Sequence, residues 1–413
     1  MNQFANIRTG FTPEGLQQKT RGDKAIWAIV VILSLTSLLV VYSATNSLAY
    51  KLYKGNTWIY LFKQIAFAGF GIAVIYFAHR FNYTIYSRLA RLLFIISIPL
   101  LIYTLKFGTN LNDANRWIRL PVLNLTFQTS DLAKLALFMY LSRLLSKKQD
   151  VIKDFKKGFL PLMFPIVAIC GLIAPANLST ALLTGATSML LLFIGRVSFR
   201  HIMMVASLVI VPVIILIFIA RTYYDEAAGK SKELPAAFSV MRLPTWIKRV
   251  QDFMYAKNDE SPYQVQQAKI AVAKGGFLGL GPGNSQQRNF LPHPYSDFIY
   301  AIIIEEYGLI GGAFIIFIYL IFLFRSIKIF RKCPYAFGAF LALALSFTLV
   351  IQAMTNMAVN VGLFPVTGVT LPLVSMGGSS IIFTSMAIGI ILSVARNVED
   401  TEGVKEEKQS VVA

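Results

Sequence analysis

Long apolar runs alternate with short polar segments along most of this 413-residue chain. A helix that crosses the hydrocarbon core of a bilayer needs about 20 mostly apolar residues, and runs of that length predict about ten such helices. They lie at approximately 25–45, 58–78, 90–106, 127–146, 159–175, 177–195, 201–221, 298–324, 336–357 and 378–396. We therefore predict an all-α polytopic membrane protein with about ten transmembrane helices, whose membrane domain (25–397) is flanked by terminal segments at 1–24 and 398–413.

The distribution of positive charge predicts the orientation. If both termini are cytoplasmic, the segments on that side hold 22 Lys and Arg residues and the short segments on the other side hold five. Cytoplasmic segments normally carry this excess, so we predict cytoplasmic termini and an even number of helices. The turn at Pro175–Asn177 decides the count, because one broken helix there would place the basic residues at 325–332 outside.

Composition agrees with a bilayer as the solvent. Hydrophobic residues make up 56% of the chain and charged residues 14%, whereas soluble proteins have roughly 25% charged residues. A net charge of +19 would suggest nucleic-acid binding in a soluble protein. Here the basic residues lie between the apolar runs and form no separate stripe with aromatic residues, so we predict contact with anionic lipid headgroups and no nucleic-acid partner.

One extracytoplasmic loop is far longer than the others. It spans about 222–297, between the seventh and eighth predicted helices, and with Arg221 it holds ten basic residues, a charge that suits a phosphate-bearing lipid. Within it, Tyr263–Ala273 has the apolar spacing of a short amphipathic or re-entrant helix. Gly275–Gly283 has five glycines in nine residues, which fits either a flexible linker or backbone that closely approaches a ligand or a neighbouring helix.

Ionisable side chains inside predicted spans usually face a cavity or a partner. Asp131 and Lys134 lie three residues apart in the fourth span, on one face of the helix. Two interpretations stay open: an internal ion pair that holds helices together, or a site at the outer end of the span where Lys134 contacts a phosphate or relays charge. Trp117, next to Arg116, suits the membrane interface with or without a further role.

Asp297 lies where the long loop re-enters the membrane, directly before the eighth predicted helix. Partial desolvation there would make its carboxylate a better general base. An aspartate at this position would also serve as the N-cap of the helix, and one residue can do both. Glu305 and Glu306 follow one to two turns into the same helix, while the three histidines are too scattered to predict a zinc site.

The segment Asn356–Ser380 mixes polar residues and glycines with apolar ones and contains Pro365 and Pro372. Proline removes a hydrogen-bond donor and interrupts a helix. Irregular backbone at membrane depth is tolerated only where it is buried in protein or lines a cavity. We therefore predict a re-entrant segment that lines a substrate groove, with candidate contacts at Asn356, Thr367, Ser375 and Ser379.

Two motifs carry a resemblance to a known family. The first comprises Tyr263, Gln264, Gly275, Gly276, Gly279, Gly281, Gly283, Asn284, Ser285, Leu291, Pro292, Ser296, Asp297, Phe298, Ile299, Glu305, Glu306 and Gly308. The second comprises Pro365, Val366, Thr367, Gly368, Leu371, Pro372, Ser375, Gly377, Gly378, Ser379 and Ser380. They resemble the large extracytoplasmic loop and the C-terminal signature of the SEDS family of bacterial cell-wall proteins, and the resemblance extends from about Ala25 to Asn397.

The resemblance implies ten helices and a peptidoglycan glycosyltransferase that polymerises lipid II, with the aspartate of the loop-to-helix junction, here Asp297, as the catalytic residue. The family's fourth-helix pattern Gln-Pro-Ser-Glu-x-x-Lys falls on residues 128–134. Thr129 replaces its proline and Asp131 its glutamate, so Lys134 carries over more securely than Asp131.

Two further segments bear on the resemblance. Asn177 stands where the family has an aspartate, which argues against an essential charge at that position. The sequence at 281–287 (GPGNSQQ) is more similar to the division branch of the family than to the elongation branch. A polymerase of the elongation branch stays an alternative.

The implied reaction is attack by a sugar 4-hydroxyl, with inversion, on an anomeric carbon that bears undecaprenyl pyrophosphate. Such a leaving group needs charge stabilisation more than protonation, so one base and several cations suffice. We predict Asp297 as the base and Lys134, Arg116 and Arg249 as contacts of the pyrophosphate, and a divalent cation, Mg²⁺ or Mn²⁺, is a candidate to share that role. The remaining candidate substrate-binding residues are Asp131, Trp117, Gln264, Asn356, Thr367, Ser375 and Ser379.

Two alternatives stay open: a lipid II flippase, and a scaffold that activates a partner synthase without chemistry of its own. The resemblance also implies a class B penicillin-binding protein, a transpeptidase, as partner, other division membrane proteins beside it, and a location in the bacterial inner membrane at the septum.

Overall fold

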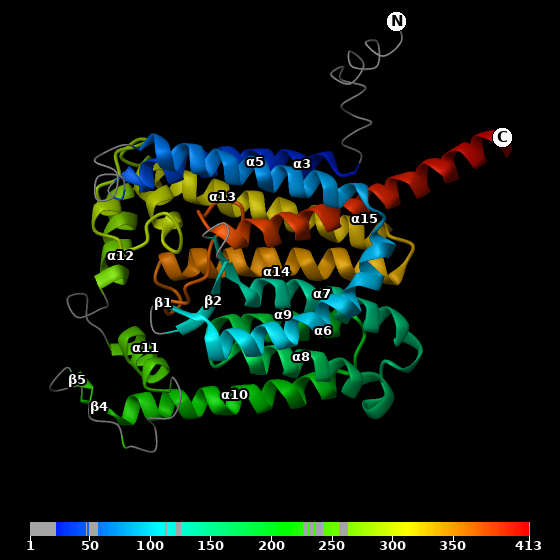
Figure 1. The fold of residues 1–413 in the computed structure, drawn as a ribbon, viewed down its shortest axis with the longest axis horizontal. Coiled ribbons are helices and arrows are strands. Elements are labelled where there is room, and N and C mark those ends of the chain that lie inside the picture. Colours follow the sequence, from blue (N-terminus) through cyan, green and yellow to red (C-terminus); the bar gives the residue numbers. More distant parts are fainter. Residues whose placement is uncertain are drawn as a thin grey trace, which may run out of the picture.

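The computed structural model describes residues 22–46, 48, 57–111, 114–120, 125–225, 230–231, 235, 243–255 and 263–412. Long helices run side by side in one bundle, and two short helices, α11 (Leu243–Tyr255) and α12 (Tyr263–Gly275), lie at one end of it, which we call the loop end (Figure 1). The long helices are α3 (Lys24–Ala44), α5 (Trp58–Arg80), α6 (Tyr83–Phe107), α7 (Thr129–Lys147), α8 (Leu160–Ile173), α9 (Leu178–Ile194), α10 (Phe199–Thr222), α13 (Ile299–Lys332), α14 (Ala336–Asn360) and α15 (Gly378–Val412).

Within the described residues, eight helices are long and apolar enough to cross a membrane; α8 is counted together with the π-helical turn before it, Phe155–Phe159, as the span Phe155–Ile173. Two more, α7 and α9, coincide with the fourth and sixth predicted spans; α9 has only 17 residues, and α7 carries charged side chains. The prediction of a helical multi-pass membrane protein is confirmed, and the number of ten crossings stays a prediction.

The turn between α8 and α9 separates two helices. Asn177 caps α9, because its Oδ1 accepts a hydrogen bond from the backbone N–H of Thr180 at 3.3 Å. The two helices pack against each other rather than continuing in line. The sequence therefore contains two helices here, and the neutral amide of Asn177 performs a capping role that requires no charge.

The start of α3 and the far part of α15 lie at the end of the bundle opposite the loop end (Figure 1). Asp23 caps α3 and forms an ion pair with Arg325, with 2.6 Å between Oδ2 and Nη2. The backbone N–H of Gly22 donates to the carboxylate of Glu399 at 2.8 Å. Both ends of the membrane domain thus meet on one side, as an even number of crossings requires, and the assignment of that side to the cytoplasm stays a prediction.

A small antiparallel sheet precedes α7, and the prediction of an all-α chain missed it. Its strands are β1 (Thr109–Leu111), β2 (Ala114–Leu120) and β3 (Leu125–Gln128), with Trp117 on β2 opposite Gln128 on β3. The predicted fourth span, 127–146, therefore begins too early, because β3 continues directly into α7 at Thr129. A second sheet pairs β4 (Tyr224–Asp225) with β5 (Lys230–Ser231) in the long loop.

The glycine run at 275–283 packs backbone to backbone against a break in α13. Gly308 interrupts that helix with φ 68° and ψ −172°. A Cβ atom on Gly279 would lie 2.2 Å from the carbonyl oxygen of Glu306, and one on Gly308 would lie 2.1 Å from that of Phe277. The N–H of Leu280 donates to the carbonyl of Glu305 at 2.9 Å. Of the two interpretations of this run, close approach to a neighbouring helix is confirmed.

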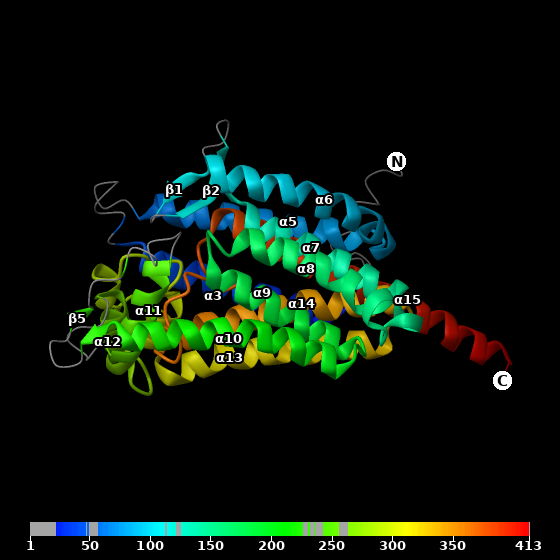
Figure 2. The same ribbon diagram turned by 90° about the horizontal axis from the view of Figure 1, so that it is seen from below.

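Helix α14 lies in the interior of the bundle and packs against α13, α7, α15 and α9 (Figure 2). The chain after it, residues 361–377, has no regular helix or strand before α15 begins at Gly378, as the two prolines predicted. We call this stretch the C-terminal segment. The predicted irregular region began at Asn356, however, and the structure keeps residues 356–360 helical, so that Asn356 projects from α14.

Candidate functional site at the loop end

Asp297 lies at the junction between the long loop and α13, half-buried, and it is not the N-cap of that helix. The N-cap is Phe298, without a capping side chain, and Asn360 of α14 accepts a hydrogen bond from the N–H of Ala301 at 3.0 Å through its Oδ1. The alternative that Asp297 caps the helix is therefore wrong. Its carboxylate Oδ1 instead accepts a hydrogen bond from the hydroxyl of Ser296 at 2.8 Å.

The backbone of Asp297 is held firmly from α14. Its carbonyl oxygen accepts hydrogen bonds from the side-chain amides of Asn356 and Asn360, each at 2.9 Å. Both asparagines are nearly or fully buried, at 1% and 0% exposed. A buried amide with satisfied partners has one defined geometry, so the position of the Asp297 carboxylate follows from α14.

Arg116 of β2 lies beside the same place. A Cβ atom on Gly368 would lie 3.6 Å from Oδ2 of Asp297 and 3.9 Å from Nη1 of Arg116, so a carboxylate and a guanidinium both border this bare backbone. Gly368 has φ +66° and is exposed. Arg116 also donates from Nε to the carbonyl of Ala176 at 2.9 Å, which fixes the guanidinium in place.

A cavity of about 270 Å³ lies between α11, α12 and the C-terminal segment, and we call it the loop cavity. Two predicted substrate contacts, Arg249 and Gln264, line it together with Lys248 and Lys269. Arg249 donates from Nη1 to the carbonyl of Val366 at 3.2 Å, which ties α11 to the C-terminal segment two residues before Gly368.

One carboxyl group offsets the cationic lining of the loop cavity. Asp252 borders the cavity one turn of α11 from Lys248. Burial raises the pKa of Asp252, and the neighbouring charge of Lys248 lowers it in part.

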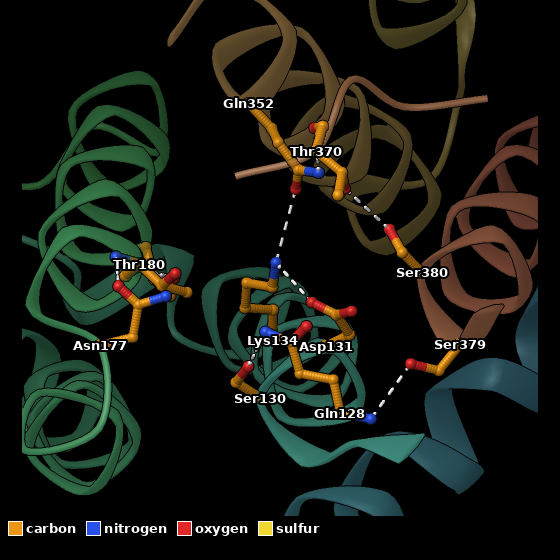
Figure 3. A network of polar contacts seen from close by, with 11 residues as sticks. Gln128, Ser130, Asp131, Lys134, Asn177, Thr180, Gln352, Thr370, Ser379 and Ser380 are labelled. Carbon is orange, nitrogen blue, oxygen red and sulfur yellow. Dashed lines mark hydrogen bonds and ion pairs between the residues drawn. The ribbon is translucent and has the colours of Figure 1, made fainter. Parts of the chain in front are cut away.

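The predicted pair Asp131 and Lys134 forms an internal ion pair, as one of the two interpretations held. Lys134 Nζ lies 2.9 Å from Asp131 Oδ1 and donates to Gln352 Oε1 at 3.4 Å (Figure 3). Gln352 in turn donates from Nε2 to the carbonyl of Thr370 at 3.0 Å. A direct phosphate contact by Lys134 stays a prediction.

The predicted polar residues of the C-terminal region join segments to one another. Ser375 donates from Oγ to the carbonyl of Ser296 at 2.6 Å, next to Asp297. Ser379 accepts a hydrogen bond from the N–H of Gln128 at 3.1 Å (Figure 3), and Thr367 is 8% exposed. Their contact with substrate stays a prediction.

Trp117, on β2, is partly buried, and its carbonyl accepts a hydrogen bond from the hydroxyl of Thr109 at 2.9 Å. The structure therefore gives it a place in the small sheet, next to Arg116. Its contact with substrate also stays a prediction.

Gln352 and Asn360 were not predicted from the sequence as site residues. They flank Asn356 at spacings of four, so that three amides form a stripe along one face of α14. That stripe is visible in the sequence. Gly368 was noted only as part of a motif, and nothing in the sequence places it beside Asp297 and Arg116.

The structure thus defines a multi-pass helical membrane protein with an aspartate and an arginine at one end of the bundle, beside a cationic cavity. Residues 23–400 match the profile of the family described as cell cycle proteins, FtsW, RodA and SpoVE. The chain belongs to this family.

Two relatives cover nearly the whole chain. Stage V sporulation protein E of Bacillus subtilis is 31% identical over 386 residues, 92% of this chain and 98% of that protein. A probable peptidoglycan glycosyltransferase FtsW of Trichlorobacter lovleyi is 32% identical over 384 residues, 91% of this chain and 94% of that one.

Solved structures share the fold. The rod shape determining protein RodA of Thermus thermophilus aligns with a TM-score of 0.62 at 20% identity, covering 91% of this chain and 97% of that one. A chain of a peptidoglycan synthase complex that coordinates polymerization and crosslinking aligns with a TM-score of 0.68 at 22% identity, covering 91% and 98%.

Proposed function

We propose that this protein is a peptidoglycan glycosyltransferase that polymerises lipid II, with Asp297 as the general base. The observation that carries the proposal is the place of Asp297: its backbone is fixed by two buried asparagines, while its carboxylate and the guanidinium of Arg116 both border Gly368. Relatives named as peptidoglycan glycosyltransferases support the same reaction class.

The reaction needs one base and stabilisation of a departing pyrophosphate. The Asp297 carboxylate accepts the proton of the acceptor's 4-hydroxyl as that oxygen bonds to the anomeric carbon, and the bond to the pyrophosphate breaks with inversion. The hydrogen bond from Ser296 orients the carboxylate. Arg116 stabilises the negative charge that develops on the leaving group, because its guanidinium is held by Ala176 before substrate arrives.

The donor set suits a divalent cation that arrives with the substrate. Among the residues that the structure describes, no three His, Cys, Asp or Glu side chains lie close enough to hold a metal. Mg²⁺ usually binds through one or two carboxylates and substrate phosphates, and Asp297 offers one carboxylate. When bound, such a cation, Mg²⁺ or Mn²⁺, would neutralise charge on the pyrophosphate.

The same proposal includes a partner and a location. A structural neighbour belongs to a peptidoglycan synthase complex, which supports a transpeptidase of the class B penicillin-binding proteins as partner. Relatives named FtsW support a role in division at the septum of the inner membrane, with the loop end outside and both termini in the cytoplasm.

The test is gel-resolved polymerisation of purified lipid II by the protein with its transpeptidase partner, comparing wild type with Asp297→Ala. Polymer from the wild type alone is the expected result. Near-normal polymer from Asp297→Ala would refute the role of Asp297. No polymer from either would favour the flippase or the scaffold, and a vesicle assay of lipid translocation would separate those two.

A further inference from the structure

We propose that Gln352 is a positioning residue through which the buried Asp131–Lys134 ion pair fixes the backbone beside Asp297. The inference rests on the proposed function and assigns the ion pair a part in it that requires no contact with substrate. It comes from one continuous path of contacts, which runs from α7 through α14 to the C-terminal segment (Figure 3).

The charge of Lys134 determines which way the Gln352 amide points. An ammonium group only donates hydrogen bonds, so the amide oxygen must face it, as it does at 3.4 Å. The amide nitrogen then faces the carbonyl of Thr370 and donates to it at 3.0 Å. The reversed amide would set its NH₂ group against the ammonium and its oxygen against a carbonyl, and both contacts are repulsive.

The carbonyl that Gln352 holds belongs to Thr370, two residues after Gly368. Asn356, one turn further along α14, donates to the carbonyl of Val369 at 2.7 Å as well as to that of Asp297. Two consecutive carbonyls, those of Val369 and Thr370, are therefore tied to α14. The residue before them is Gly368, which borders Asp297 and Arg116. A shift of Thr370 would move this backbone, and misplacement by about 1 Å can slow a reaction on the order of a hundredfold.

The surroundings of Lys134 favour positioning over contact with a phosphate. Its side chain is only 15% exposed and that of Asp131 only 10%. The two cavities that border Lys134 measure about 30 and 20 Å³, which leaves room for about one or two water molecules each. The loop cavity, at about 270 Å³, is the larger space, and its lining does not include Lys134.

The experiment is a cycle of variants assayed as lipid II polymerisation with the transpeptidase partner present. One variant removes the ion pair as a unit, Asp131→Leu with Lys134→Met, because loss of a single partner would leave an unpaired buried charge. A second is Gln352→Met, and a third combines all three substitutions. If the pair acts through Gln352, each of the first two lowers kcat about tenfold with KM changed less than twofold, and the combination also loses about tenfold.

A combined loss of about a hundredfold would mean independent roles and would overturn the inference. So would a rise in KM on removal of the pair with kcat unchanged, since that result indicates substrate contact. If the wild-type protein made no polymer, the proposed function itself would be refuted. If the wild type were active and the kcat losses of the ion-pair variant and of Gln352→Met multiplied in the combined variant, only this inference would be refuted.

Two single substitutions keep the test decisive if the combined variant does not fold. Gln352→Glu retains a partner for Lys134, and its ionised carboxylate cannot donate to Thr370. At a pH where the new carboxyl is ionised it should therefore lose as much kcat as Gln352→Met; full activity there would contradict the inference. Thr348→Val is the matched control, because Thr348 lies one turn earlier on α14, borders both small cavities, and donates within its own helix to Ala344 at 2.8 Å. Its activity should match the wild type.

Discussion

Two kinds of carboxylate lie within ten residues around the start of α13, and their surroundings are opposite. Glu305 and Glu306 are 0% and 1% exposed. Glu305 accepts hydrogen bonds from the hydroxyl of Ser285 and from the N–H groups of Gln286 and Gln287, at 3.0 and 3.2 Å for the latter two. Asp297 is half-buried, and its carboxylate borders the exposed Gly368, as the guanidinium of Arg116 does. A carboxylate surrounded by backbone donors holds structure, whereas one at an open position near a cation is available for chemistry.

The comparison also bears on the flippase alternative. Acidic residues inside a predicted span suggest a polar path through the bilayer. Here Oε1 of Glu306 accepts hydrogen bonds from the hydroxyl of Ser43 on α3 and from the N–H of Ser285 in the loop, the latter at 3.3 Å. Glu305 binds the loop that follows the glycine run. Both side chains therefore fix the loop to the broken helix, although Oε2 of Glu306 is buried without a hydrogen-bond partner among the described residues. The contacts of Glu305 are structural and give no evidence for a path.

The largest expected effect is a loss of polymerisation activity without a loss of stability, on substitution of Asp297. Asp297→Asn keeps the shape of the side chain and removes the base, so polymerisation should fall at least about a hundredfold. Because the backbone of Asp297 is held through its carbonyl, the melting temperature in detergent should stay within about 2 °C of the wild type. If Asp297→Asn kept more than a tenth of normal activity, Asp297 would not be the base, and its contrast with the structural carboxylates Glu305 and Glu306 would not hold.

The next effect concerns the contact between the glycine run and α13. Gly279→Ala places a methyl group 2.2 Å from the carbonyl of Glu306, so the loop must separate from the helix, and we expect loss of most folded protein on size-exclusion chromatography. Gly276→Ala is the matched control, because Gly276 also has positive φ, +51°, but nothing within 4 Å of the added Cβ. It should cost only about 1 kcal/mol. Equal behaviour of the two variants would contradict the close packing.

Glu305→Gln should lower stability and spare the chemistry. The amide NH₂ would meet backbone N–H groups that now donate to a carboxylate, and a buried donor left unsatisfied costs about 1–3 kcal/mol. We expect the melting temperature to fall by about 2–6 °C while polymerisation per folded molecule stays near normal. If activity fell as far as in Asp297→Asn without a change in melting temperature, Glu305 would belong to the catalytic group.

The membrane helices could be predicted from the sequence because each is a single apolar run whose length the bilayer sets. The glycine run was ambiguous because the backbone it packs against, at Gly308, lies some thirty residues further along the chain. Only the tertiary structure brings the two together. Asp297 was found from its position before a helix. Its relation to Arg116 was not, because the small sheet that places Arg116 depends on pairing between strands rather than on helical periodicity.

The smallest expected effect tests the loop cavity. Arg249→Met should raise KM for lipid II about threefold, since a partly exposed charge contributes little, and the difference should shrink in high salt. Asp252→Asn is the control of opposite sign and should lower KM. Because burial raises the pKa of Asp252, its carboxyl becomes neutral as the pH falls through that raised value, and the cavity becomes more positive. The wild-type KM should therefore decrease toward lower pH more than that of Asp252→Asn; identical pH profiles would mean that this carboxyl does not face the substrate.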